Sequence, residues 1–291
     1  MLFVQLAING VALGCLYALV ALGLVLIYKA TEAVNFAQGD LLMLGAFLAL
    51  TLIGIAGLPF WLGFVLAIAG MALIGAVVQR VFIQPLLGQP QFAVIMLTIG
   101  LGFLLRSAAS MVPGWGTVSQ ALPNPFAGTT LNIGTLVVAQ DHLAIILATL
   151  VLSLLLYLFF QRTRFGLAMQ AASQNQLAAA YMGIPLRRVF AATWALAAAV
   201  ACVGGVLLAP IALVDANMGF VVLKAFPAAV LGGFTSLPGA VVGGIIIGLI
   251  EVFSGVYLSE TAKHIAAYVV LLLVLVVKPE GLFGTVQRRR A

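Results

Sequence analysis

Charged residues are scarce in this sequence. Lysine, arginine, aspartate and glutamate make up 7% of the 291 residues, whereas soluble domains carry roughly 25%. A soluble fold of this size could not cover its surface with so few charges, so a water-soluble globular protein is excluded. Hydrophobic residues make up 64% of the chain and the mean hydropathy is +1.26. We therefore expect the lipid bilayer to be the solvent.

Residues that carry chemistry are also few. The two cysteines, Cys15 and Cys202, lie inside apolar runs, so neither a disulfide nor a metal pair is expected. No Ser-His-Asp arrangement occurs, and no G-x-x-x-x-G-K-[ST] motif that would cradle ATP phosphates. We expect no catalytic residue, metal or cofactor in this chain. Energy for any work must come from another subunit or from an ion gradient.

The uncharged runs predict the membrane spans. Residues 1–28 carry no charged side chain, so the basic start of a signal peptide is missing and we expect a retained first span. Gly57-Leu58-Pro59 predicts a turn between two helices in the run from Asp40 to Arg80. The expected spans are 4–28, the two helices within 40–80, 91–112, 143–161, 190–212, 225–236, 239–257 and 264–278.

Basic residues set the expected orientation. The net charge of +6 is spread over the ends of apolar segments and forms no single face, so nucleic-acid binding is not expected. Segment 162–189 and the tail are arginine-rich and should be cytoplasmic. The chain must then reverse at Pro238-Gly239 on the cytoplasmic side, which gives nine crossings with the N-terminus outside, or eight if 225–236 is re-entrant. Segment 113–141, rich in Pro and Gly, is expected to be a periplasmic connection with a short hairpin. The tail arginines are Arg288, Arg289 and Arg290.

Small residues recur at a four-residue spacing. Gly10 and Gly14, Gly239 and Gly243, and Gly244 and Gly248 each form a G-x-x-x-G pair. Helices in lipid cannot use the hydrophobic effect to associate, so close backbone packing at small residues matters. We expect these glycines to pack helices together, with Pro238 and Gly239 also marking a helix break.

Ionisable residues inside spans are costly and favour a functional role. Arg106 lies deep in its span and could snorkel outward or bind a carboxylate. Glu251 lies midway through 239–257 and could neutralise Arg106. A structural or gating role is favoured over direct substrate contact for both. Asp215 and Lys224 flank a predicted periplasmic turn, where docking of a binding protein and plain solvation are both open.

The turn from Asn35 to Asp40 has two interpretations. Its polar groups, Asn35 and Gln38 among them, could form a broken-helix element near a transport pathway, since irregular backbone at depth is tolerated only inside protein or along a cavity. Alternatively it is a cytoplasmic loop with a helix N-cap, which the predicted topology favours.

A short helix is expected in the cytoplasmic segment. Residues from Gln174 to Met182 are mostly good helix formers, Gly183 fits the position after the helix and Pro185 ends it. Its small-residue surface could dock into a groove on a partner protein, or the helix could lie on lipid.

Segment 162–188 resembles the EAA loop of ABC-importer permeases in its branched-chain amino acid form. The resemblance implies that the loop helix docks on an ATPase and transmits its closure. Gln176, Ala178, Ala179, Ala180 and Gly183 follow the pattern. Leu177 departs from it, because the family has a glutamate there, and this puts one polar contact to the ATPase in doubt.

Other segments are similar to the same family in order and spacing. They include Val34–Asp40, Leu97–Leu101 with Thr98, the run from Lys224 to Gly244, and Pro279–Gly284. The chain is identified as a member of the branched-chain amino acid permease family, closer to its H-type than its M-type subunit. Asn35, Gln38, Thr98, Arg106 and Glu251 become candidates for translocation or gating.

The resemblance implies an all-α, polytopic permease that forms a single transmembrane domain of about eight to nine helices, residues 1–291, in a bacterial inner membrane. It implies import of branched-chain amino acids by alternating access, with an M-type permease, two cytoplasmic ATPases that bind ATP and Mg, and a periplasmic solute-binding protein. Related permeases for urea, short amides or aromatic acids look alike in sequence. An ion-coupled secondary transporter is the alternative of another class; it would place paired acids or broken helices in both halves of a repeat.

Overall fold

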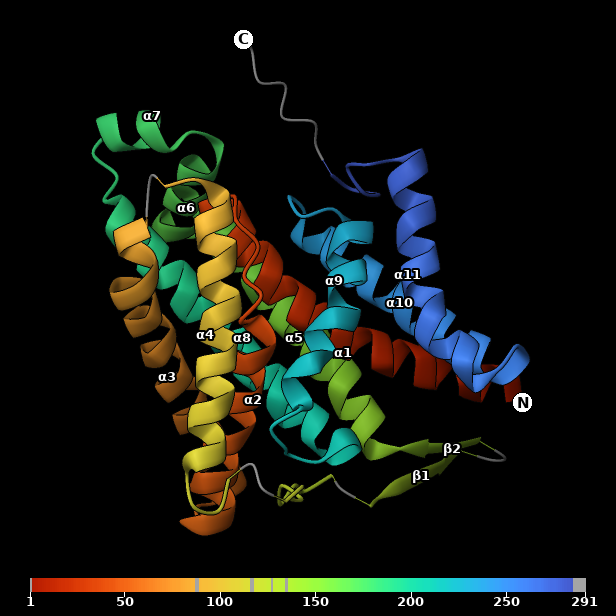
Figure 1. Cartoon of the computed structure of the whole chain (residues 1–291). Coiled ribbons are helices and arrows are strands. Elements are labelled where there is room, and N and C mark those ends of the chain that lie inside the picture. The colour runs from red at the N-terminus through yellow and green to blue at the C-terminus, as the bar shows by residue number, and fades with distance from the viewer. Residues whose placement is uncertain (1, 87–88, 116–117, 127, 134–135, 285–291) are drawn as a thin grey trace.

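The computed structural model describes residues 2–86, 89–115, 118–126, 128–133 and 136–284. In this part of the chain, eight helical segments are long and apolar enough to cross a bilayer, which confirms the expected polytopic all-α fold (Figure 1). The arginine tail at 288–290 lies outside the described residues. The eight segments are α1 (Leu2–Thr31), α2 (Gln38–Ala49) with its π-helical extension Leu50–Ile55, α3 (Phe60–Val78) extended to Leu86, α4 (Gln91–Met111), α5 (Gln140–Arg162), α8 (Leu186–Ala212), α10 (Leu237–Tyr257) and α11 (Glu260–Val277).

The helix boundaries follow the local sequence. Gly57 adopts a left-handed φ of +68° between α2 and α3, where the Gly57-Leu58-Pro59 turn was expected. Pro59 and Pro90 stand directly before α3 and α4, at positions where a missing N–H costs no helical hydrogen bond.

The short helix α9 (Val221–Gly232) follows a turn and the 3-10 helix Met218–Phe220. Its 12 residues span about 18 Å, less than the roughly 30 Å of a hydrocarbon core. Val214, before it, pairs with Gln120 of the connection between α4 and α5. At the other end, the carbonyls of Leu231 and Gly232 accept hydrogen bonds from the C-terminal tail. Residues 214–232 therefore run from one end of the molecule to the other.

The break between α9 and α10 lies slightly earlier than expected. Gly233 has a φ of +96°, and Ser236 caps α10 because its Oγ accepts a hydrogen bond from the Gly239 N–H at 3.1 Å. Pro238 and Gly239 consequently belong to the first turn of α10, and the prediction that they form the break itself is wrong. Proline is well suited to this first turn because its ring fixes a helical φ.

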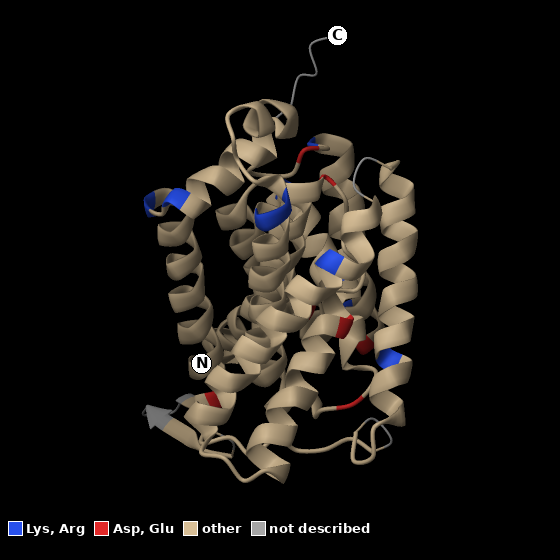
Figure 2. Cartoon of the chain, turned by 90° about the vertical axis from the view of Figure 1, so that its left-hand side faces the viewer, with Lys and Arg blue, Asp and Glu red and all other residues tan. Residues whose placement is uncertain are grey.

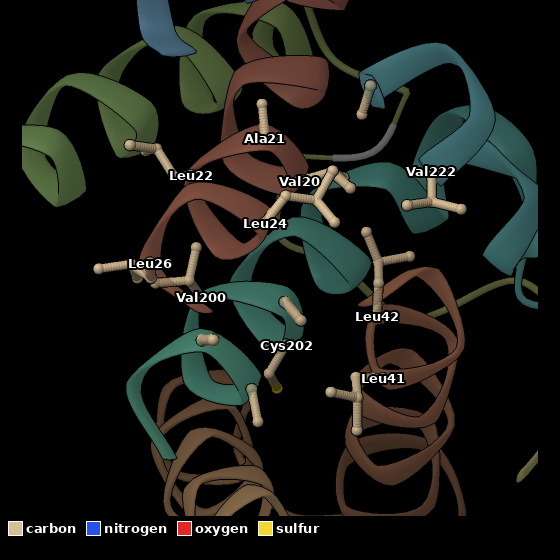
Figure 3. Close-up of a cluster of buried hydrophobic side chains, with 14 of the residues drawn as sticks. Val20, Ala21, Leu22, Leu24, Leu26, Leu41, Leu42, Val200, Cys202 and Val222 are labelled. Carbon is tan, nitrogen blue, oxygen red and sulfur yellow. The ribbon is translucent and has the colours of Figure 1, made fainter. Parts of the chain in front are cut away.

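Helix α1 lies at the centre of the bundle. Most of its residues are buried, and it packs along α5, α8, α9 and α10. Figure 3 shows Val20 and Leu24 of α1 close to Leu42 of α2, with side chains from α8 and α9 completing the cluster. Such all-round burial explains why α1 is uniformly hydrophobic and has no polar face.

Glycines allow α1 and α10 to come into backbone contact. A Cβ built on Gly14 would lie 2.6 Å from the Cα of Ile245, and one on Gly244 would lie 2.6 Å from the backbone N of Ala18. Gly10 faces Leu249 in the same way, while Gly239 and Gly243 face the backbone of α9. These approaches are too close for any larger residue.

The two ends of the bundle differ. One end carries the connection between α4 and α5, which contains the antiparallel hairpin of β1 (Thr130–Ile133) and β2 (Leu136–Ala139); this confirms the expected hairpin. The other end carries α6 (Arg164–Gln174), α7 (Gln176–Tyr181) and the tail (Figure 1). Figure 2 shows that long stretches of helix between these ends carry no charged residue.

Candidate functional site

The connection between α1 and α2 lies inside the protein. Asn35 is 1% exposed and Gln38 is fully buried, so the interpretation of this turn as a cytoplasmic loop is wrong. The chain leaves α1 at Thr31 and folds back among the helices before α2 begins at Gln38. Helix α2 therefore starts within the bundle.

Polar side chains replace the missing helical hydrogen bonds of this connection. Asn35 Oδ1 accepts from the Ala37 N–H at 3.1 Å, and Asn35 Nδ2 donates to Gln38 Oε1 at 3.3 Å. Gln38 Nε2 donates to the Ala197 carbonyl of α8 at 3.1 Å. Thr98 of α4 accepts from the Phe36 N–H at 3.2 Å. Backbone at this depth is stable only because protein groups satisfy it.

Arg106 lies beside this connection and pairs with Asp40. Its Nη2 and Nε lie 2.8 and 3.1 Å from Asp40 Oδ1, and its guanidinium stacks on Phe220 at 4.0 Å from the ring centre. Arg106 therefore binds a carboxylate, as one of the two expectations held, but Glu251 is not its partner. We name Asn35, Gln38, Asp40, Thr98 and Arg106 the central polar cluster.

Glu251 belongs to a second charged group, the Lys224 pair. Its carboxylate forms an ion pair with Lys224 of α9 and accepts a hydrogen bond from the Tyr17 hydroxyl of α1 at 2.6 Å. The Glu251 side chain is 2% exposed and that of Lys224 28%. Lys224 was expected to flank a periplasmic turn, but α9 begins at Val221 and carries Lys224 into the bundle.

A single element touches both charged groups. The short turn η4 (Met218–Phe220) brings Phe220 against Arg106, and α9 directly after it carries Lys224 to Glu251. Gly39 and Gly219 allow α2 and this turn to meet at backbone distance. The η4–α9 element is thus tied to α2 and α4 on one side and to α1 and α10 on the other.

The structure unites four of the five candidate translocation residues and sets Glu251 apart. Sequence reasoning did not assign Asp40, Lys224 and Tyr17 as partners, although the need of each intramembrane charge for a counter-charge was a usable signal. Among the described residues, no group of three or more His, Cys, Asp or Glu side chains could hold a metal ion. The arrangement can hold and release charge pairs between helices, which suits a moving pathway better than covalent chemistry.

The arginine-rich segment folds into two helices joined at Asn175. Asn175 ends α6 and caps α7, because its Oδ1 accepts from the Ala178 N–H at 2.9 Å. The single helix expected from Gln174 to Met182 is therefore shorter, and α6 was not expected. Gly183 has a φ of +82°, which fits the residue that follows a helix.

Helix α7 is attached to the bundle on one face and open on the other. Gln176 Nε2 donates to the Ala30 carbonyl at the end of α1 at 3.1 Å, and Ala179 is buried. Leu177, Tyr181 and Met182 are 66%, 83% and 84% exposed. We name these three residues the α7 apolar patch.

Comparison with known proteins identifies the family. Residues 6–277 match the family described as branched-chain amino acid transport system / permease component. Among solved structures, PsaBC from Streptococcus pneumoniae in complex with Fab aligns with a TM-score of 0.49 and 16% identity, over 94% of this chain and 92% of that one.

Relatives of known function are similar over almost the whole chain. The high-affinity branched-chain amino acid transport system permease protein LivH of Salmonella typhimurium is 34% identical over 97% of this chain and 96% of its own length. The permease protein BraD of Pseudomonas aeruginosa is 31% identical over the same shares. The probable permease LivH of Methanocaldococcus jannaschii is 27% identical over 92% of this chain and 89% of its own. The chain therefore belongs to the branched-chain amino acid transport permease family.

Proposed function

We propose that this chain is the H-type permease subunit of an ATP-driven importer that moves branched-chain amino acids across a bacterial inner membrane. The observation that carries the proposal is the identity of 34% to LivH over 97% of the chain. Apolar solutes need few polar groups along their path, which agrees with a bundle whose described interior is polar chiefly at two charged groups.

The pathway residues of the proposal are those of the central polar cluster together with Glu251. Helices that begin inside a membrane place polar backbone and side chains next to a cavity. Helix α2 meets the η4–α9 element at Gly39 and Gly219. Alternating access would move η4–α9 relative to α2 and α4. The Asp40–Arg106 and Lys224–Glu251 ion pairs would stabilise the conformation in which they are formed here.

Coupling to ATP is assigned to α7, with Gln176, Leu177, Ala178, Ala179, Ala180 and Gly183. The α7 apolar patch presents an exposed hydrophobic surface to a partner, here an ATPase. Gln176 links α7 to the end of α1, so a displacement of α7 by the ATPase would be transmitted directly to α1. The leucine in place of the family's glutamate makes this contact apolar.

The assembly comprises this chain, an M-type permease, two ATPases that bind ATP and Mg in the cytoplasm, and a periplasmic solute-binding protein. Lipid surrounds the spans. The segment 113–141 faces the periplasm, where the binding protein docks, and the segment 162–189 faces the cytoplasm.

Reconstitution of the complex in nanodiscs tests the proposal. The chain, tagged and expressed in its native membrane, should co-purify with a second permease and P-loop ATPases, and loaded binding protein should stimulate hydrolysis. Tyr181→Ala with Met182→Ala should lower the stimulated ATPase rate at least several-fold, while the double control Val276→Ala with Val277→Ala on α11 should not. Val276 and Val277 are also 84% exposed, so the control truncates two equally exposed apolar side chains.

Other outcomes separate the alternatives. If the binding protein carries urea, a short amide or an aromatic acid, the proposed substrate is wrong, but the proposal of an ATP-driven importer is retained. If the chain purifies alone, and uptake stops when the proton or sodium gradient collapses, the ATP-driven mechanism is wrong.

A further inference from the structure

A cleft between α1, α5 and α10 lies near the end of the bundle that carries α6 and α7. Its volume is about 570 Å³, and it is lined by Leu22, Lys29, Leu154, Tyr157, Gln161, Gln170, Ser236, Val241 and Val242, among others. The cleft exists because α5 packs along α1 and scarcely touches α10. Figure 3 shows Leu22, on its inner wall, pointing from α1 towards α5.

The charged lining residue lies at the mouth of this cleft. Lys29, Gln161 and Ser236 stand at the last turn of α1, the last turn of α5 and the N-cap of α10. Leu22, Leu154 and Val241 stand five to seven residues farther into the same helices, which is about 8–10 Å at 1.5 Å per residue. Ser153, next to Leu154, is a polar residue at that depth. The cleft thus has a mouth that carries Lys29 and a mainly apolar floor.

The mouth carries a positive charge that the described protein does not neutralise. Lys29 is half-buried, and its ammonium lies 5.9 Å from the ring centre of Phe160. The three ion pairs formed by the described residues are Arg106–Asp40, Lys224–Glu251 and Lys263–Glu260, and none involves Lys29. The positive end of the α10 dipole faces the same mouth.

We propose that this cleft binds one anionic phospholipid of the cytoplasmic leaflet, with its phosphate on Lys29 and its acyl chains along Leu154, Val241 and Val242. Basic clefts between spans on the cytoplasmic side are suited to anionic headgroups. The lipid joins α5 to α10, which the protein itself leaves apart.

Native mass spectrometry of the full-length protein in mild detergent tests the site. The delipidated wild type should take up phosphatidylglycerol in preference to phosphatidylcholine. Lys29→Gln should weaken phosphatidylglycerol uptake about five-fold or more, and Lys29→Arg should retain it. Arg80→Gln is the matched control, since Arg80 is exposed at the same end of the bundle on α3 and away from the cleft; it should bind as the wild type does.

A second variant tests the apolar half independently. Val242→Trp fills the floor of the cleft and leaves Lys29 in place, and it should also reduce phosphatidylglycerol uptake. The proposal is overturned if phosphatidylcholine binds as well as phosphatidylglycerol, or if Lys29→Gln and Arg80→Gln behave alike. It is also overturned if Tyr157→Cys, at the rim, cross-links to a second permease chain, because a protein would then cover the cleft.

Discussion

Glu251 holds a negative charge at a position that is 1% exposed, and its two partners come from α1 and α9. Glu251→Gln removes the charge and leaves Lys224 without its carboxylate. Loss of one member of a buried ion pair lowers the free energy of unfolding by about 3–5 kcal/mol. Because Lys224 is partly exposed, we expect a smaller decrease of about 2–3 kcal/mol. We expect a lower Tm in nanodiscs and a several-fold loss of uptake.

Tyr17→Phe is the graded comparison for that variant. It removes one hydrogen bond to Glu251 and retains the ion pair, so we expect the free energy of unfolding to fall by about 1–2 kcal/mol. Equal melting temperatures for Glu251→Gln and the wild type would show that the pair adds no stability.

Glycines differ sharply in what surrounds them. Gly14→Ala places a methyl group 2.6 Å from the Cα of Ile245 and should force α1 and α10 apart, at a cost of about 1–3 kcal/mol. Gly100→Ala, in the middle of α4, meets nothing within 4 Å and should be neutral or stabilising by up to about 1 kcal/mol. Thermal unfolding of both variants measures the difference. Similar losses at the two sites would contradict the backbone packing of α1 on α10.

At the scale of elements, helix α2 is joined to α4 by the Asp40–Arg106 pair. Each single change, Asp40→Leu or Arg106→Leu, leaves one charge unpaired within the bundle, whereas the double change removes both. We expect the double variant to be more stable than either single variant, by about 1–3 kcal/mol. A double-mutant cycle on melting and on uptake checks this. Strictly additive losses would mean that the two residues do not interact.

The long spans were predictable because most are uncharged runs bounded by charge, Pro or Gly. The connection between α1 and α2 was harder. Asn35 and Gln38 suggest a polar turn in sequence, and their burial depends on Thr98 and Ala197, which pack around the connection from α4 and α8. The partner of each charge was not predictable either. Asp40 and Arg106 lie 66 positions apart, and their meeting depends on how α2 and α4 cross.

For the whole molecule, the orientation in the membrane can be measured by labelling single introduced cysteines, because the wild-type chain should not be labelled. Both native cysteines, Cys15 and Cys202, are buried, so the wild-type chain should resist a membrane-impermeant maleimide. Val118→Cys, in the connection between α4 and α5, should react from outside in intact cells. Met182→Cys, on the α7 apolar patch, should react only after permeabilisation. The reverse pattern would invert the topology and with it the assigned faces.

The tail that follows α11 has a consequence for biosynthesis. Helix α9 is too short to span the bilayer and carries Lys224, and its last carbonyls are satisfied by the N–H groups of Leu282 and Phe283. A ribosome that has made α9 has not yet made these groups, so the helix has no finished place until almost the entire chain has emerged. The η4–α9 element can therefore reach its final packing only when synthesis of the chain is nearly complete. A chain that stops shortly after α11 leaves the carbonyls of Leu231 and Gly232 without these hydrogen bonds.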